Sequence, residues 1–196
     1  MISRLRRLSR RGQLAAAGCL LAVAALAVAG VTAAASGHPA AAALPRAKNF
    51  RLQALNHPGT VSLAAYQNRP VIINFFASWC APCQRETPLL ARYYAGQHGR
   101  VAIIGVDAND KPAAALRFLR SKGVRYPVAS DPFPASTATS YGVAALPQTF
   151  FLNARHEIVR HLFGPVTLRQ LTTGTAAMNA RPGAAAAALG AGRNGS

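Results

Sequence analysis

The stretch Val71–Cys83, which reads VIINFFASWCAPC, is the part of the sequence that decides the fold. Its first half is a run of β-branched and aromatic residues, typical of a strand that is buried on both faces of a sheet. Two cysteines separated by two residues follow at once, and apolar residues at helical spacing continue over residues 82–97. The stretch therefore predicts a central strand that leads directly into a helix, with Cys80 at the beginning of that helix.

The segments on either side alternate between strand and helix patterns. In chain order we expect strands at 50–55, 61–63, 71–76, 101–106, 126–129, 149–152 and 157–163, and helices at 82–97, 112–122, 135–141 and 166–178. Strands alternating with helices imply parallel strands joined by right-handed crossovers. The pattern predicts an α/β fold with a mixed central sheet and helices on both faces.

The two ends of the chain differ in composition from the rest. Five arginines within residues 1–11 precede an apolar stretch over 14–35, which is a targeting pattern and about long enough to cross a bilayer. Residues 1–45 are expected to be a cleaved signal peptide or a membrane anchor whose N-terminus stays in the cytoplasm. Residues 180–196 are expected to be a disordered low-complexity tail. The folded domain, 49–179, would then lie outside the cytoplasm, in the periplasm or at the cell exterior, anchored or secreted.

The charge of the chain is strongly positive but spread along it. Lys and Arg number 22 and Asp and Glu number 5, a net charge of +17. Without the N-terminal arginine cluster, 17 basic residues remain against five acidic ones. The sequence contains no nucleic-acid-binding motif and no basic patch interleaved with aromatics. We therefore expect no nucleic-acid partner and interpret the excess as suited to a domain beside an anionic membrane surface.

Cys80 and Cys83 stand where a redox pair would work. Outside the cytoplasm, two cysteines at this spacing near a βαβ pattern indicate a redox-active disulfide. Unpaired N–H groups and the helix dipole favour a thiolate at Cys80, so we assign it as the nucleophile that attacks a substrate disulfide. Cys83, about one turn further in, then attacks Cys80 and releases the reduced substrate. The pair is itself the redox group, and no other cofactor is expected.

The sequence resembles the exported TlpA/ResA/DsbE-like disulfide reductase family of thioredoxin-fold proteins, from about residue 50 to residue 171. Three segments carry the resemblance: the strand Val71–Phe76, the cysteine box Trp79–Cys83, and the later stretch Tyr141–Phe150. It implies a thioredoxin-like three-layer fold and a thiol-disulfide oxidoreductase that reduces protein disulfides. It further implies cytochrome c maturation, with apocytochrome c cysteines or other exported thiols as clients and a membrane thiol carrier as electron donor.

The resemblance also assigns the residues that would contact a substrate. It makes Pro147 a cis-proline that faces the cysteines, so that the backbone of Leu146 is turned toward an extended substrate segment. Trp79 and Pro82, within the cysteine box, complete the expected substrate-binding set. Trp79 is expected to pack beside the disulfide and shape the substrate groove, and the alternative is a role in core packing alone.

Glu86 follows Cys83 by three positions and therefore shares its helix face. It is the only acidic residue within the 35 positions before it and the 20 after it. In similar proteins a glutamate here tunes the thiols, so we expect its carboxylate to accept and return the proton of Cys83. The alternative is a solvated helix residue near Arg85. Asn74 stands where thioredoxin carries a buried Asp, and an amide cannot transfer that proton.

Other interpretations of the cysteine pair compete with the redox one. A structural disulfide would close a loop too short to stabilise the fold much. Structural zinc needs four ligands, and the histidines are not paired at ligand spacing, so no metal site is expected. The alternative function is a copper-binding assembly protein, which would need His156 or His161 beside both cysteines. A peroxidase of the same fold would need Thr or Ser where the chain has Ala77.

Overall fold

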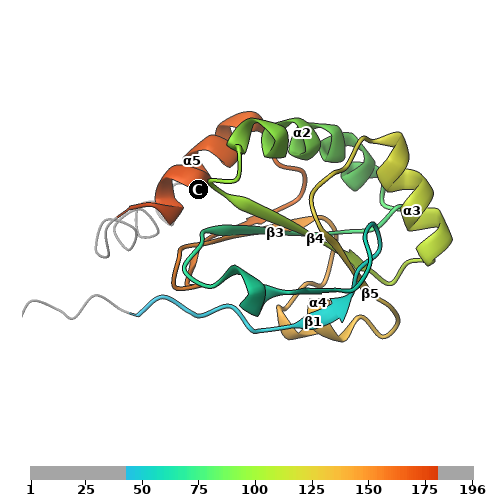
Figure 1. Ribbon diagram of the computed structural model, residues 1–196, viewed down its shortest axis with the longest axis horizontal. Coiled ribbons are helices and arrows are strands. Elements are labelled where there is room, and N and C mark those ends of the chain that lie inside the picture. Colours follow the sequence, from blue (N-terminus) through green and yellow to red (C-terminus); the bar gives the residue numbers. More distant parts are fainter. Residues whose placement is uncertain (1–42, 181–196) are drawn as a thin grey trace, which may run out of the picture. The chain divides into compact units, whose positions relative to one another are not determined.

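The computed structural model describes residues 43–180 of the chain (Figure 1). The expected signal or anchor, with its apolar stretch at 14–35, lies outside the described residues up to position 42, and the expected tail lies outside them from position 181. Among the described helices, none has both the length and the apolar character needed to span a bilayer. The first described residues already contact the domain: Leu44 packs against the buried core, and the Pro45 carbonyl accepts the N–H of Ile158 at 2.8 Å.

Five strands form the central sheet, in the order β5-β4-β3-β6-β7. β3 (Val71–Phe76) lies in the middle, parallel to β4 (Ala102–Ala108) and antiparallel to β6 (Gln148–Leu152). β5 (Val128–Asp131) runs parallel to β4 at one edge, and β7 (Ile158–Phe163) runs antiparallel to β6 at the other. The predicted mixed sheet with a central strand at 71–76 is confirmed.

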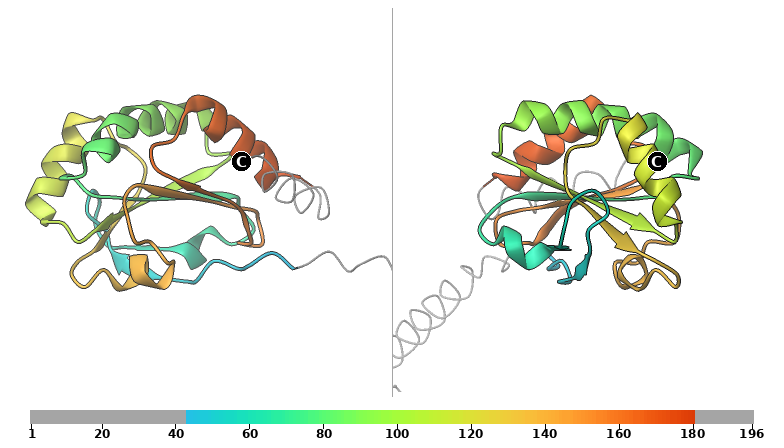
Figure 2. Two further views of the ribbon diagram at one scale, coloured as in Figure 1. Left: turned by 180° about the vertical axis from the view of Figure 1, so that it is seen from behind. Right: turned by 45° about the vertical axis from the view of Figure 1, so that its right-hand side comes forward.

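Helices cover both faces of this sheet (Figures 1 and 2). One face carries α2 (Ala81–Gln97), α3 (Pro112–Ser121) and α5 (Leu168–Met178), which lie above the sheet in Figure 1. The other face carries the short helix α4 (Ser136–Ser140) and the 3₁₀ turn η1 (Leu63–Tyr66). Every residue of β3, β4 and β6 is buried, because their apolar side chains meet a layer of helices or turns on each side.

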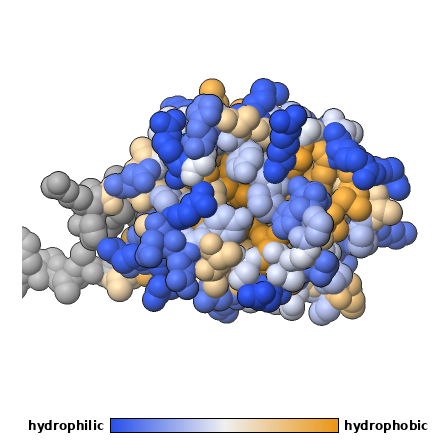
Figure 3. Space-filling model, in the orientation of Figure 1, coloured by the Kyte–Doolittle hydropathy of each residue, from blue (hydrophilic) through white to orange (hydrophobic). Residues whose placement is uncertain are grey.

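A separate two-stranded sheet lies on the same side as α4. Its strands, β1 (Arg51–Gln53) and β2 (Thr60–Ser62), pair antiparallel as a hairpin. The outer surface seen in the view of Figure 1 is hydrophilic around smaller hydrophobic areas (Figure 3). The predicted outer hairpin is present as a sheet of its own, and Ala54, the residue after β1, forms a single antiparallel bridge with Ala129 of β5.

Two predicted boundaries differ from the structure for identifiable reasons. The strand expected from residue 126 begins only at Val128, because Pro127 has no N–H to donate to a neighbouring strand. The helix expected from residue 166 begins at Leu168, because Thr167 caps it. The Thr167 hydroxyl accepts the N–H of Gln170, and the Gln170 side chain accepts the N–H of Thr167.

Gly174 of α5 provides a test of how closely this helix packs on the sheet. A Cβ at this position would lie 2.3 Å from Cε1 of Phe151, whose side chain in β6 is fully buried. Gly174→Ala should therefore lower the free energy of unfolding by about 1–2 kcal/mol, because overpacking outweighs the helix preference of alanine. Urea unfolding of the two proteins measures the difference.

Gly96→Ala is the matched control, since Gly96 also lies in a helix but nothing lies within 4 Å of its added Cβ. It should raise the free energy of unfolding by up to about 1 kcal/mol. A Gly174→Ala variant that gains stability as Gly96→Ala does would contradict the close contact between α5 and β6.

Candidate active site

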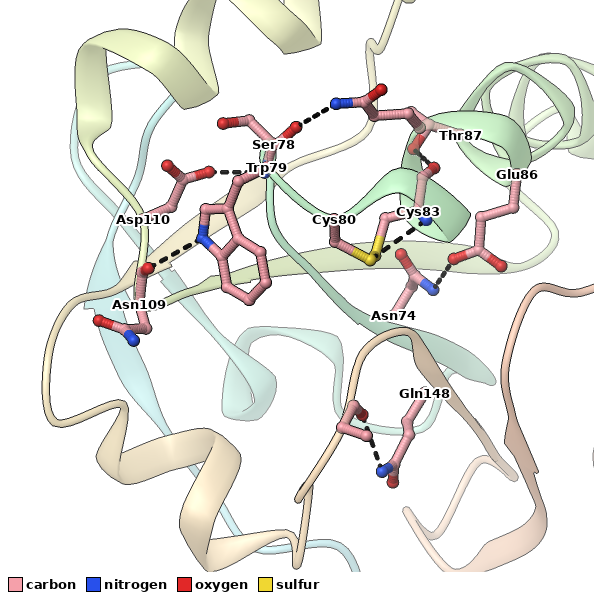
Figure 4. Close-up of a disulfide and its surroundings, with 12 residues drawn as sticks. Asn74, Ser78, Trp79, Cys80, Cys83, Glu86, Thr87, Asn109, Asp110 and Gln148 are labelled. Carbon is pink, nitrogen blue, oxygen red and sulfur yellow. Dashed lines mark hydrogen bonds between the residues drawn. A yellow bond between two sulfur atoms is a disulfide. The ribbon is translucent and has the colours of Figure 1, made fainter.

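Cys80 and Cys83 form a disulfide at the N-terminus of α2 (Figure 4). The two sulfurs are 2.07 Å apart, and the exposed fractions of Cys80 and Cys83 are 5% and 0%. Cys80 is the N-cap residue, and its Sγ accepts the backbone N–H of Cys83 at 3.3 Å. After reduction this N–H and the helix dipole would favour a thiolate on Cys80. Pro82 occupies the first turn, where its missing N–H leaves no helical hydrogen bond unmade.

The loop before Cys80 is held by the segment that follows β4. The backbone N–H of Ser78 donates to Oδ2 of Asp110 at 2.6 Å, and Nε1 of Trp79 donates to the carbonyl of Asn109 at 3.1 Å. The Trp79 side chain is 60% exposed. The alternative that Trp79 serves only to pack the core is therefore wrong, and Figure 4 shows its ring between Asn109 and the cysteines.

Glu86 is buried inside the domain, with an exposed fraction of 2%. Its Oε1 accepts Nδ2 of Asn74 at 2.9 Å, and its Oε2 accepts the backbone N–H of Val166 at 2.8 Å. The alternative of a solvated residue near Arg85 is therefore wrong. Burial raises the pKa of Glu86 to about 7, because its effect is larger than that of the two hydrogen bonds, which lower the pKa. A carboxyl group with this pKa can both accept and donate a proton at neutral pH.

Asn74 is the site residue whose role sequence reasoning missed. It is fully buried in β3 directly opposite Thr149 of β6, and Nδ2 donates to both Glu86 and Oγ1 of Thr149, the latter at 3.0 Å. In the described part of the chain, its Oδ1 has no hydrogen-bond partner. The Asn74 amide cannot transfer a proton, but it holds the carboxyl group of Glu86, which can. The only signal in the sequence was a polar residue within an otherwise apolar strand.

The Leu146–Pro147 peptide bond is cis and lies on the loop that enters β6. This loop is held at three points: the Pro147 carbonyl accepts the N–H of Gly164 at 2.9 Å, Nε2 of Gln148 donates to the Ala145 carbonyl at 3.0 Å, and Gln148 is hydrogen-bonded to His161 at 2.8 Å. Among the hydrogen bonds within residues 43–180, none uses the backbone of Leu146. Its N–H and C=O therefore stay available to a partner.

A cleft of about 440 Å³ lies beside Trp79. Its lining includes Asn109, Asp110, Lys111 and the ring of Phe133, which is 83% exposed. Phe133 was not predicted as a site residue, because nothing in the sequence around it places it next to the cysteine loop.

The histidines considered for copper are engaged elsewhere. Nε2 of His156 is 3.0 Å from the Tyr66 carbonyl, and the ring of His161 stacks on Phe150 at a centroid distance of 3.9 Å. In the part of the chain that the structure describes, no three His, Cys, Asp or Glu side chains gather closely enough to hold a metal ion. The copper alternative thus lacks the histidine it requires beside the cysteines within residues 43–180.

A central strand that runs into a helix capped by a disulfide-forming cysteine pair, with a cis-proline loop on the adjacent strand, defines a thioredoxin-fold thiol-disulfide oxidoreductase. The comparisons with known proteins agree. The chain belongs to the AhpC/TSA family, whose model matches residues 45–161.

Similar proteins carry thiol-disulfide names. The chain is 31% identical over 122 residues to the thiol-disulfide oxidoreductase ResA of Bacillus subtilis (strain 168), a match over 62% of this chain and 67% of that protein. It is 35% identical over 119 residues to the thiol:disulfide interchange protein DsbE homolog of Paracoccus denitrificans, over 59% and 64% of the two chains. The matches thus span about two thirds of each relative. The resemblance to ResA- and DsbE-type oxidoreductases is confirmed.

A solved structure supports the fold. The chain matches a DsbF homologue from Corynebacterium diphtheriae with a TM-score of 0.61 and 24% identity, over 72% of this chain and 94% of that one.

Asn74→Leu tests whether the buried amide sets the protonation of Glu86. Leucine keeps the volume but removes the donor that stabilises the carboxylate, so the pKa of Glu86 should rise above 7. The side-chain carboxyl ¹³C shift of Glu86, followed against pH in the oxidised protein, measures it. Thr149→Val is the control, because it removes the other acceptor of Asn74 and should leave the pKa nearly unchanged. A pKa of Glu86 that stays at about 7 in Asn74→Leu would refute this role for Asn74.

Proposed function

We propose that this protein is an extracytoplasmic reductase of protein disulfides, with Cys80 as nucleophile and Cys83 as resolving thiol. One observation carries the proposal. Cys80 is slightly exposed at the N-cap of α2, where its sulfur accepts the backbone N–H of Cys83. Cys83 is fully buried about one turn further along the same helix, which also carries Glu86.

The first step is attack by the Cys80 thiolate on one sulfur of a substrate disulfide. The substrate S–S bond breaks, a bond between Cys80 and the substrate forms, and the second substrate sulfur leaves as a thiolate that takes a proton from solvent. Before the attack, the Cys83 N–H and the positive end of α2 stabilise the negative charge on Cys80.

The second step is resolution by Cys83. Glu86 takes the proton of the buried Cys83 thiol, and the resulting thiolate attacks Cys80. The mixed disulfide breaks, the substrate leaves with both sulfurs reduced, and the bond between Cys80 and Cys83 forms as in the structure. Two electrons have moved from the cysteine pair to the substrate. A thiol donor must then reduce the pair, and Glu86 returns the proton to Cys83.

The surface around the disulfide suits a polypeptide substrate. Four large apolar side chains are exposed within residues 43–180, and all lie on segments next to the site: Trp79, Phe133, Phe163 and Leu168. Trp79 and Phe133 line the same cleft. Phe163 pairs in the sheet with Gln148, the residue after Pro147. Leu168 lies two residues after Val166, whose backbone N–H donates to Glu86. With the free backbone of Leu146, they offer apolar contacts and a strand-like edge.

The charges near the cysteines favour the reducing direction. Ala81 and Pro82 place no positive side chain between the two cysteines, and Glu86 is an acid on the same helix. An acidic neighbour opposes a thiolate, so it favours the disulfide and makes the dithiol the better reductant.

The location and the clients rest on the sequence. The arginine cluster and apolar stretch of residues 1–45 support export or membrane association. The resemblance to the exported disulfide reductases supports protein thiols as clients, apocytochrome c cysteines among them, and a membrane thiol carrier as electron donor.

The roles of the two cysteines separate in single-cysteine variants. Cys80→Ser should abolish reduction of insulin disulfides, because Cys83 is fully buried and cannot attack a protein substrate. Cys83→Ser should instead accumulate mixed disulfides through Cys80, visible on non-reducing gels. Full insulin reduction by Cys80→Ser would show that the mechanism is wrong.

The proton role of Glu86 predicts a pH profile for resolution. In the wild type, the decay of the mixed disulfide should accelerate as pH rises through about 7, because only the carboxylate can take the Cys83 proton. Glu86→Gln should lose this inflection and resolve about 100-fold more slowly at pH 7. Glu157→Gln, which changes the other glutamate of the chain, is the control and should keep the wild-type profile. An unchanged profile in Glu86→Gln would remove Glu86 from the mechanism.

A further inference from the structure

Asp107 is a second buried acid, on the strand next to the one that leads to the cysteines, and the mechanism above does not use it. It lies near the end of β4, opposite Phe76, the last residue of β3. Its exposed fraction is 1%, and its Oδ1 has no hydrogen-bond partner among residues 43–180. An ionised carboxylate in this position would be buried with an unpaired oxygen, which is unfavourable.

Asp110 connects this buried acid to the cysteine loop. Its Oδ2 accepts the N–H of Ser78 and its Oδ1 accepts the N–H of Lys111, both at 2.6 Å. Its carboxyl group also lies close enough to that of Asp107 for a hydrogen bond between the two. Because an ionised carboxylate only accepts, such a bond requires that one of the two groups carries a proton.

The groups of residues 43–180 packed around the pair include no salt-bridge partner for it. β5 contributes Ser130, opposite Asp107, and Asp131, whose carboxylate accepts the N–H groups of Thr137 and Ala138. Lys111 contributes its backbone N–H, while its side chain is on an exposed residue. Within residues 43–180 the one salt bridge is elsewhere, between Arg155 and Glu157.

We propose that Asp107 and Asp110 share one proton, and that this proton keeps the loop of Ser78 and Trp79 docked where Cys80 can react. Protonated Asp107 donates its O–H to Asp110, which leaves Asp110 to hold Ser78. Asn109, in the same segment, holds the indole N–H of Trp79. Asp107 and Asp110 are thus positioning residues that act on Cys80 through the loop before it.

The shared proton makes the position of the loop sensitive to pH. Burial first, and the negative charge of Asp110 next, raise the pKa of Asp107 to about 8. Below that pH Asp107 is protonated and can donate its O–H to Asp110. As pH rises through about 8, Asp107 releases its proton to solvent and the two carboxylates repel each other. Asp110 is then pushed from Ser78, and the loop with Trp79 loosens.

Trp79 is the only tryptophan of the chain, so its fluorescence reports on this loop alone. The experiment follows emission of the full-length oxidised protein between pH 6 and 10, with the cysteines held in the disulfide. The wild type should show a transition with a midpoint near pH 8. Asp107→Asn, whose side-chain N–H donates to Asp110 at every pH, should abolish this transition. Glu86→Gln, which removes the other buried acid of raised pKa, should retain it.

Asp110→Asn provides a second arm should Asp107→Asn fail to fold. Without the negative charge of Asp110, the pKa of Asp107 falls, so the fluorescence midpoint should move below that of the wild type. A flat wild-type titration, a transition near pH 8 that survives in Asp107→Asn, or an unmoved midpoint in Asp110→Asn would each overturn the proposal.

A kinetic readout connects the pair to the reaction. Above pH 8, insulin reduction by the wild type should fall below that by Asp107→Asn, because the loop that carries Cys80 has loosened. If the wild type and Asp107→Asn reduce insulin at equal rates at pH 7 and again at pH 9, the positioning role is contradicted. The fluorescence titration uses no substrate, so its failure is distinct from a failure of the proposed reductase function.

Discussion

The junction between β3 and α2 is the constraint on which the rest of the structure depends. β3 is buried on both faces and sits in the middle of the sheet, so its end is surrounded by neighbours. The parallel β4 ends at the same edge and supplies Asn109 and Asp110, which hold the loop before Cys80. The antiparallel β6 begins at that edge and brings the cis-proline loop. The strand directions alone therefore gather three segments, distant in sequence, around one disulfide.

Two buried carboxyl groups lie on elements that meet at this junction, Glu86 on α2 and Asp107 on β4. The pKa values of Glu86 and Asp107 are raised above their ordinary values, to about 7 and about 8, chiefly by burial. Each group therefore favours the folded state most at low pH, and its contribution is lost as pH rises from near 4 through the raised pKa. Burial of the two acids therefore costs stability near neutral pH, and it keeps both groups titratable in that pH range.

Local patterns in the sequence predicted the parts of the site that depend on neighbours in the chain. The apolar strand, the cysteine spacing and the helical periodicity after it are consecutive, so the strand, the disulfide and the position of Glu86 on the helix followed from them. The inward direction of Glu86 did not, because it requires Asn74 and Val166 from other elements. The contact between Asp107 and Asp110, and the hydrogen bond from Ser78 to Asp110, depend on the register of β4 against β3, which no sequence pattern specifies. The core-packing alternative for Trp79 is wrong because its indole N–H is bound to the Asn109 carbonyl at the surface, a contact that depends on the segment after β4.

The central claim is that electrons flow from the cysteine pair to the substrate, and the reduction potential of the pair tests it. The proposed reductase direction rests on the absence of positive charge at Ala81 and Pro82 and on the acid at Glu86. The measurement is the reduction potential of the pair, from the fraction oxidised in redox buffers at pH 7. The account predicts a value close to that of thioredoxin, about −270 mV. A value near about −120 mV, typical of a strong disulfide donor, would contradict it and make the protein an oxidase.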